Sequence, residues 1–152
     1  MFSNKETAGK HMICDIFNIK NLDLLNSKEL LLELLKNICN KYNFEILNKV
    51  DHSFTPYGCT ILFLLSESHI SIHTFPEKNH LSFDIYTCRE YKNNNEYINI
   101  FHYLIESLNA SRESECKIID RSFNVKIENK KKYKINNNEN LDLFDFYTPF
   151  ES

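Results

Sequence analysis

The chain has 152 residues and a formal net charge of -3, with 18 lysine and arginine residues against 21 acidic ones. That length suits one compact domain with a hydrophobic core of its own, and the slight negative charge gives no electrostatic attraction to nucleic acid. Residues 1–12 lack the apolar core of a signal peptide, and no stretch approaches the roughly 18 apolar residues of a membrane span. We therefore expect a cytoplasmic protein with neither nucleic acid nor a membrane as a partner.

Five cysteines are spread along the chain without a Cys-x-x-Cys pair, at Cys14, Cys39, Cys59, Cys88 and Cys116. An odd number at these spacings suits neither a disulfide framework nor a structural zinc site. We expect reduced and mostly buried thiols.

The first third of the chain predicts a strand, a helix and a second strand. Residues 11–19 mix β-branched and aromatic side chains, as strands do, and Ser27 is a favourable N-cap for a helix that runs to about Tyr42. Residues 44–50 are a plausible second strand. The apolar stripe of the helix consists of Leu31, Leu34, Leu35 and Ile38.

The middle of the chain predicts two strands joined by a tight polar junction. Residues 59–65 are continuously apolar, and after the polar residues 66–68 the apolar pattern resumes until Pro76 stops it. In residues 81–88 apolar and polar side chains alternate with the period of a strand, which places Cys88 on the face opposite the buried one.

The last third predicts a helix and a final strand. An asparagine-rich turn at 93–95 precedes the helix, and residues 116–128 form the strand. The expected apolar side of the helix consists of Tyr97, Phe101, Leu104, Ile105 and Leu108. Because strands outnumber helices and each helix has a single apolar stripe, we expect an α+β fold, a two-layer α/β sandwich with a mainly antiparallel sheet and helices packed on one face.

The expected domain covers residues 1–128. Residues 129–152 open with three lysines, become rich in asparagine and end in an acidic aromatic segment. This tail is either a linker with a docking segment or an additional edge element.

Reactive side chains are concentrated in residues 66–77, which contain serines, two histidines and two carboxylates. One interpretation is an ordinary strand with solvent-facing polar residues. A metal site formed by His69 and His73 with Glu77 or Asp84 is disfavoured, because residues four apart in a strand are about 13 Å apart. A nucleophile, Ser68 or Cys88, activated by either histidine is the third interpretation, and the spacing alone leaves it open.

Two segments carry a family resemblance. Residues 67–77, Glu-Ser-His-Ile-Ser-Ile-His-Thr-Phe-Pro-Glu, resemble the processing site of the prokaryotic-type S-adenosylmethionine decarboxylases. Residues 83–88, Phe-Asp-Ile-Tyr-Thr-Cys, resemble a second motif of that family at the expected offset. Weaker matches occur at residues 9–11, 52–56 and 58–60.

The resemblance implies that the chain cuts itself between Glu67 and Ser68 into residues 1–67 and 68–152. Ser68 would become a covalent pyruvoyl group that forms a Schiff base with S-adenosylmethionine, with neither a metal nor pyridoxal phosphate as cofactor. His73 matches a histidine that assists processing, Thr60 a hydroxyl that supports it, and Cys88 the cysteine that returns a proton after decarboxylation.

The resemblance also implies a substrate site and an assembly. Phe54 matches an aromatic residue that stacks on adenine and Glu77 a carboxylate that binds the ribose. A homodimer of processed protomers and a role in spermidine biosynthesis are expected. Arg89 departs from the glycine common in the family, so decarboxylation of arginine or ornithine remains an alternative, as does a non-catalytic partner of an active paralogue.

Overall fold

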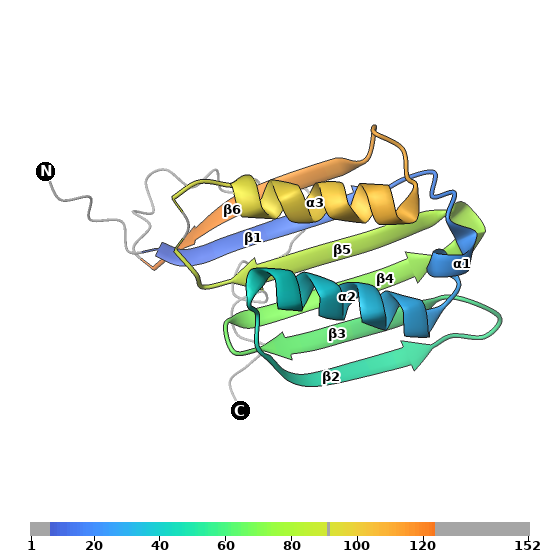
Figure 1. Cartoon of the computed structure of the whole chain (residues 1–152), viewed down its shortest axis with the longest axis horizontal. Helices are drawn as coiled ribbons and strands as arrows, with labels where there is room; N and C mark the ends of the chain where they lie inside the picture. Colours follow the sequence, from blue (N-terminus) through green and yellow to red (C-terminus); the bar gives the residue numbers. More distant parts are fainter. Residues whose placement is uncertain (1–6, 91, 124–152) are drawn as a thin grey trace, which may run out of the picture.

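The computed structural model describes residues 7–90 and 92–123, which form one six-stranded sheet with helices on one of its faces (Figure 1). The strand order is β2-β3-β4-β5-β1-β6, and all neighbouring strands are antiparallel. The elements are β1 (Thr7–Ile16), α1 (Leu22–Leu25), α2 (Lys28–Tyr42), β2 (Ile46–Ser53), β3 (Cys59–Leu65), β4 (Ser68–Phe75), the short 3-10 helix η1 (Pro76–Lys78), β5 (His80–Thr87), α3 (Asn95–Leu108) and β6 (Glu115–Ser122). The expected α+β sandwich is confirmed.

Helix α2 begins and ends where its sequence predicts. The Ser27 side chain accepts a hydrogen bond from the backbone N–H of Leu30, and Asn43 ends the helix in the left-handed conformation at φ 56°. The predicted stripe is buried, together with Cys39. Helix α1 was not predicted, because a four-residue helix capped by Asn21 has too few residues to establish a periodic pattern.

Helix α3 confirms the second predicted helix but presents a slightly different face to the sheet. Its buried side chains are Tyr97, Ile100, Leu104 and Leu108. Ile100 is buried although it was not among the expected apolar positions, whereas Phe101 and Ile105 are only partly buried against the core.

The strands agree with the prediction best where the apolar pattern is clearest. Residues 59–65 form β3 as expected, and β5 covers the predicted alternating segment apart from Cys88. Strand β2 begins two residues later than expected, at Ile46, because Phe44 is buried in the core directly after the end of α2. The part of the last predicted strand beyond residue 123 and the tail 129–152 lie outside the described residues.

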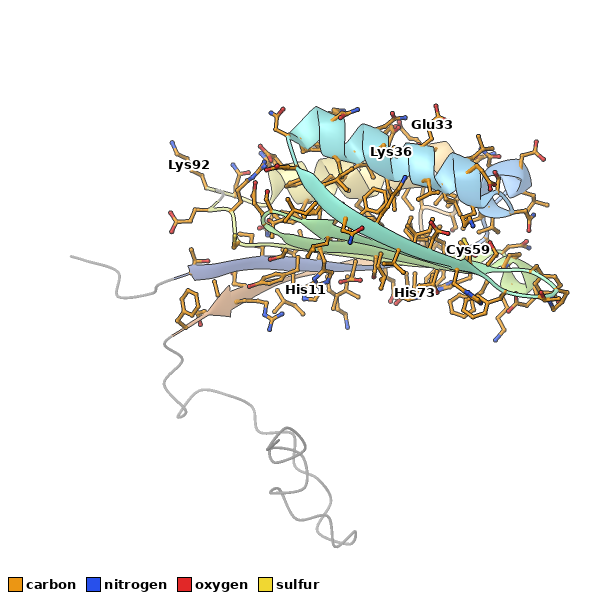
Figure 2. All side chains as sticks on the ribbon, turned by 90° about the horizontal axis from the view of Figure 1, so that it is seen from below. His11, Glu33, Lys36, Cys59, His73 and Lys92 are labelled. Carbon is orange, nitrogen blue, oxygen red and sulfur yellow. The ribbon has the colours of Figure 1, made fainter. Side chains whose placement is uncertain are left out.

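The two faces of the sheet have different surroundings. Alternate residues of β3 and β5 are buried against α2 and α3, whereas the residues between them point away from the helices. We call this second side the open face, because no helix in the described part of the chain covers it, and both His11 and His73 lie on it (Figure 2). Several large apolar side chains are exposed there, namely Ile13, Leu62, Leu64, Phe75 and Ile119.

None of the helices in residues 7–90 and 92–123 is long and apolar enough to span a membrane.

Candidate active site

The junction between Glu67 and Ser68 lies in the tight turn between β3 and β4. Leu65 pairs with Ser68 across these strands, so residues 66 and 67 alone form the turn. Ser68 has φ 140°, a value that residues with a side chain rarely adopt and that stores strain in the backbone. The peptide bond that the sequence singles out is therefore followed directly by a strained serine.

Cys88 lies beside this turn because β5 ends next to the beginning of β4. Ser68 pairs with Thr87, and the backbone N–H of the following residue, Cys88, donates a hydrogen bond to the carbonyl oxygen of Glu67 at 3.0 Å. An N–H in this position polarises the Glu67 carbonyl and would stabilise negative charge on its oxygen during nucleophilic attack. Ser68, the Glu67 carbonyl and Cys88 thus form the first cluster of site residues.

Cys88 differs from the other cysteines in its exposure. All five thiols are free, and only Cys88 is exposed, whereas Cys14, Cys39 and Cys59 are buried and Cys116 is half-buried. Burial raises the pKa of the Cys39 thiol to about 11 and also raises the pKa of Cys59, which keeps both protonated. The prediction of mostly buried thiols is confirmed, with Cys88 the accessible one.

A second cluster lies at the other end of β4. Thr60 and His73 are opposite each other on β3 and β4, and the hydroxyl oxygen of Thr60 is 2.9 Å from Nδ1 of His73. Phe54 follows β2 at the same end of the sheet, is 52% exposed, and packs edge-on against His52. Glu77 is in η1, which continues directly from β4.

The structure brings the predicted site residues together in these two groups and not in one. His73 follows Ser68 by five residues on β4, which corresponds to about 16 Å along a strand. Within one chain His73 is therefore too far from Ser68 to act as its base. His69 is next to Ser68 in the sequence, but its imidazole points to Asp84.

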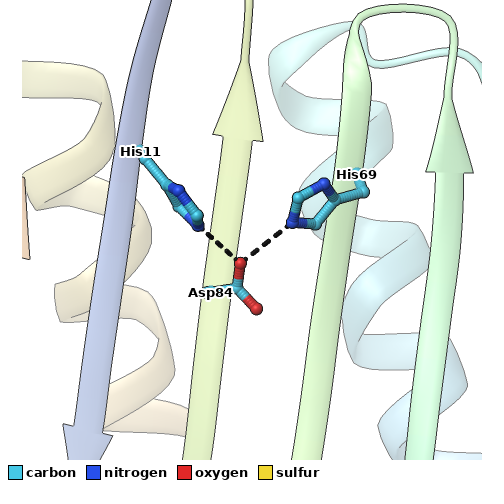
Figure 3. A group of neighbouring side chains, drawn as sticks. All are labelled: His11, His69 and Asp84. Carbon is cyan, nitrogen blue, oxygen red and sulfur yellow. Dashed lines mark hydrogen bonds and ion pairs between the residues drawn. The ribbon is translucent and has the colours of Figure 1, made fainter. Parts of the chain in front are cut away.

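Two imidazoles converge on one carboxylate in the centre of the open face (Figure 3). The Nε2 atoms of His11 and His69 lie 2.7 and 3.0 Å from the same Oδ2 atom of Asp84, and the Ser71 hydroxyl donates to the other carboxylate oxygen. Burial opposes ionisation of Asp84, but the hydrogen bonds from Ser71, His11 and His69 outweigh it and lower the pKa of this carboxyl. Asp84 is therefore held as an anion.

Among residues 7–90 and 92–123, His11, His69 and Asp84 form the group of side chains that could hold a metal ion. Their ligand atoms lie within 4.8 Å of one another, and two imidazoles with a carboxylate suit a divalent transition metal. The sequence did not reveal this group, because His11 is 73 residues away from Asp84 and only the pairing of β1 with β5 brings them together. His73 is not part of this group, as expected from the strand spacing that disfavoured His69 and His73 as joint ligands.

Comparisons with known proteins agree with the fold and the motifs. The family model described as S-adenosylmethionine decarboxylase matches residues 10–122. The S-adenosylmethionine decarboxylase proenzyme 2 of Bacillus cereus is 43% identical over 82 residues, which cover 54% of this chain and 66% of the relative. The corresponding proenzyme of Clostridium botulinum is 38% identical over 81 residues, or 53% of this chain and 69% of the relative. The aligned segment thus spans about two thirds of these relatives.

A solved structure has the same fold. The crystal structure of the adenosylmethionine decarboxylase from Aquifex aeolicus matches 82% of this chain and 99% of that chain, with 28% identity and a TM-score of 0.68. The family match covers most of the chain, including both clusters of site residues. The chain belongs to the S-adenosylmethionine decarboxylase family.

Proposed function

We propose that this protein is a cytoplasmic S-adenosylmethionine decarboxylase of spermidine biosynthesis that matures by cutting itself between Glu67 and Ser68. The observation that supports this most directly is the hydrogen bond from the Cys88 N–H to the Glu67 carbonyl oxygen, at 3.0 Å. This hydrogen bond polarises the Glu67 carbonyl, and the Ser68 hydroxyl, on the next residue, is the nucleophile that would attack it. The same turn carries the accessible thiol that the decarboxylation step needs.

Self-cleavage requires only groups of this protein, from one or both chains of a dimer, and water. The Ser68 hydroxyl attacks the Glu67 carbonyl carbon, the C–N bond breaks, and the hydroxyl proton moves to the Ser68 nitrogen, which leaves an ester and a free amine. A base then removes the Ser68 Cα proton, the Cβ–O bond breaks, and Glu67 leaves as a carboxylate. The remaining unit tautomerises to an imine, and water replaces its nitrogen, which departs as ammonia, to give the pyruvoyl group.

The local geometry favours the first of these steps. The Cys88 N–H would stabilise the oxyanion that forms on the Glu67 oxygen. Breaking the peptide bond also frees Ser68 from φ 140°, so strain in the uncut turn is released on cleavage. Glu67, Ser68 and Cys88 therefore suit the formation of the pyruvoyl group that the family resemblance implies.

The pyruvoyl group would supply a carbonyl that captures the substrate amine and accepts electrons as carbon dioxide leaves. Cys88, exposed at the end of β5 beside the cleavage turn, would return a proton to the substrate carbon. Phe54 would stack on the adenine and Glu77 would bind the ribose hydroxyls. No metal or pyridoxal phosphate takes part in these roles.

We further propose a homodimer in which two chains complete each site. Ser68 lies about 16 Å from His73 along β4, since each residue of a strand adds roughly 3.3 Å. If the open faces of two chains packed together with their β4 strands running in opposite directions, His73 and Thr60 of one chain would approach Ser68 of the other. Exposed apolar residues on this face, such as Leu64 at 53% and Phe75 at 40%, would be buried in such a contact.

Two measurements on the purified protein test this function. Intact-mass analysis should find two fragments, residues 1–67 and 68–152, with the second beginning in a pyruvoyl group. Release of carbon dioxide should then be measured with S-adenosylmethionine, arginine and ornithine in parallel, and the Ser68→Ala variant serves as the uncut control. An uncut chain with full activity would contradict the mechanism, and release from arginine or ornithine alone would change the substrate.

A further inference from the structure

Arg89 binds the side chain of the residue at the cleavage site. Its Nε atom is 2.5 Å from Oε2 of Glu67, and its Nη2 atom is 2.6 Å from Oε1 of the same carboxylate. Both side chains are largely shielded from water, with 27% of Arg89 and 24% of Glu67 exposed. The two parallel bonds fix the direction of the carboxylate as well as its position.

Arg89 is itself held by the end of α2. Its Nη1 atom donates to the carbonyl oxygen of Tyr42 and its Nη2 atom to that of Asn43, both at 2.6 Å. The last carbonyls of a helix lack partners within the helix and carry the negative end of its dipole, so they suit a guanidinium. The guanidinium also lies over the Phe44 ring, 4.5 Å from its centroid. Arg89 therefore ties the cleavage turn to a rigid helix.

The two anchors of Glu67 come from consecutive residues. The Cys88 N–H holds the Glu67 carbonyl oxygen, and Arg89 holds the Glu67 carboxylate. With both ends fixed, Glu67 has little freedom to rotate, and its carbonyl carbon stays where the Ser68 hydroxyl must attack. Fixing reacting groups in this way raises the rate of an intramolecular reaction.

We propose that Arg89 is a positioning residue for self-cleavage, which holds Glu67 in place for the acyl shift to Ser68. The inference rests on the proposed function, because it assumes that the chain cuts itself at this bond. Lysine could not replace Arg89 fully, since an ammonium group cannot bind a carboxylate with two parallel N–H groups while also reaching two carbonyls.

The test is a time course of cleavage after cell-free synthesis of the full chain, followed by intact mass. Arg89→Ala should slow cleavage at least tenfold and Arg89→Lys several-fold, while Arg112→Ala, at an exposed turn, should match the wild type. Glu67→Gln combined with Arg89→Ala should be no slower than Arg89→Ala alone, because Arg89 acts through the Glu67 side chain. Unfolding of Ser68→Ala with and without Arg89→Ala measures any loss of stability separately.

Hydroxylamine identifies the step that is affected. It cuts an ester between Glu67 and Ser68 but leaves a peptide bond intact, so it should not restore cleavage of the Arg89→Ala chain. Cleavage of Arg89→Ala at the wild-type rate, or its full rescue by hydroxylamine, would overturn the proposal while leaving self-cleavage standing. A wild-type chain that never cuts would overturn both.

Discussion

Thr60 and His73 are hydrogen-bonded across β3 and β4, with 2.9 Å between the hydroxyl oxygen and Nδ1, at the end of β4 opposite to Ser68. This pair cannot assist cleavage of its own chain, so the proposed function predicts that it assists cleavage of the partner. A mixed dimer tests this directly.

Chains carrying His73→Ala and chains carrying Ser68→Ala should each remain uncut on their own. In mixed dimers isolated with two different tags, the His73→Ala chain should be cut, because its Ser68 meets the partner's His73. A control dimer of His73→Ala with the double variant Ser68→Ala/His73→Ala should stay uncut. Cleavage of the His73→Ala chain on its own, or its failure in the mixed dimer, would contradict a shared site.

The strained backbone at Ser68 predicts a difference between two uncut variants. Glycine adopts φ 140° without steric cost, whereas alanine retains the strain of serine, so Ser68→Gly should be more stable than Ser68→Ala by about 1 kcal/mol. Urea unfolding of the two chains measures the difference. Equal midpoints and slopes would show that the turn stores no strain at this residue.

The sequence predicted the helices and strands of this fold better than it predicted which strands pair with each other. The apolar run at 59–65 and the helical stripe after Ser27 each identify an element by its own periodicity, and both were found where expected. Pairing between distant strands has no such local signal, so the contact of His11 with Asp84 was not predicted. The four-residue helix α1 was also missed, because so short an element has no periodic pattern that the sequence could show.

For the candidate site, the sequence identified residues without their arrangement. Family motifs pointed to Ser68, His73 and Cys88, but the proximity of Cys88 to Glu67 follows from the register of β4 with β5. The separation of His73 from Ser68 could have been calculated from the rise of a strand. The bidentate contact of Arg89 with Glu67 could not have been predicted from the sequence, because it depends on how the end of α2 packs against the cleavage turn.

The lowered pKa of Asp84 predicts a dependence of stability on pH. Because its pKa is lower in the folded chain than the ordinary value of 3.8, the ionised carboxylate stabilises the fold above pH 3.8, and this contribution is lost as the pH falls below it through the folded pKa. Urea unfolding of the uncut Ser68→Ala chain between pH 6 and pH 3 should show this loss. Adding Asp84→Asn should flatten the curve in that range, whereas Asp23→Asn, at an exposed position, should not. If stability fell equally with pH in the Asp84→Asn and Asp23→Asn chains, the pH dependence would have to come from groups other than Asp84.

Chelation separates the proposed mechanism from one that uses the group of His11, His69 and Asp84 as a metal site. Since Asp84 already satisfies both imidazoles, and cleavage uses Ser68, we expect EDTA to leave both the cleavage time course and carbon dioxide release unchanged. A metal requirement would instead be established by two results together. EDTA would abolish cleavage or carbon dioxide release and added divalent metal would restore it, and the His11→Ala chain would lack the same activity.

The roles of Cys88 in cleavage and in decarboxylation can be separated, because the first uses its backbone and the second its thiol. Cys88→Ser keeps the N–H that binds the Glu67 carbonyl oxygen, so this variant should cut itself at a rate close to that of the wild type. A serine hydroxyl is a much weaker acid than a thiol, and removal of a general acid typically costs on the order of 100-fold or more, so carbon dioxide release or correct protonation of the product should fall by about that factor. Cys116→Ser, which alters a half-buried thiol on β6, serves as the matched control and should retain both activities. If Cys88→Ser were cut normally and also decarboxylated S-adenosylmethionine at the wild-type rate to the normal product, the proton would have to come from another group, and Cys88 would retain only its backbone role at the cleavage turn.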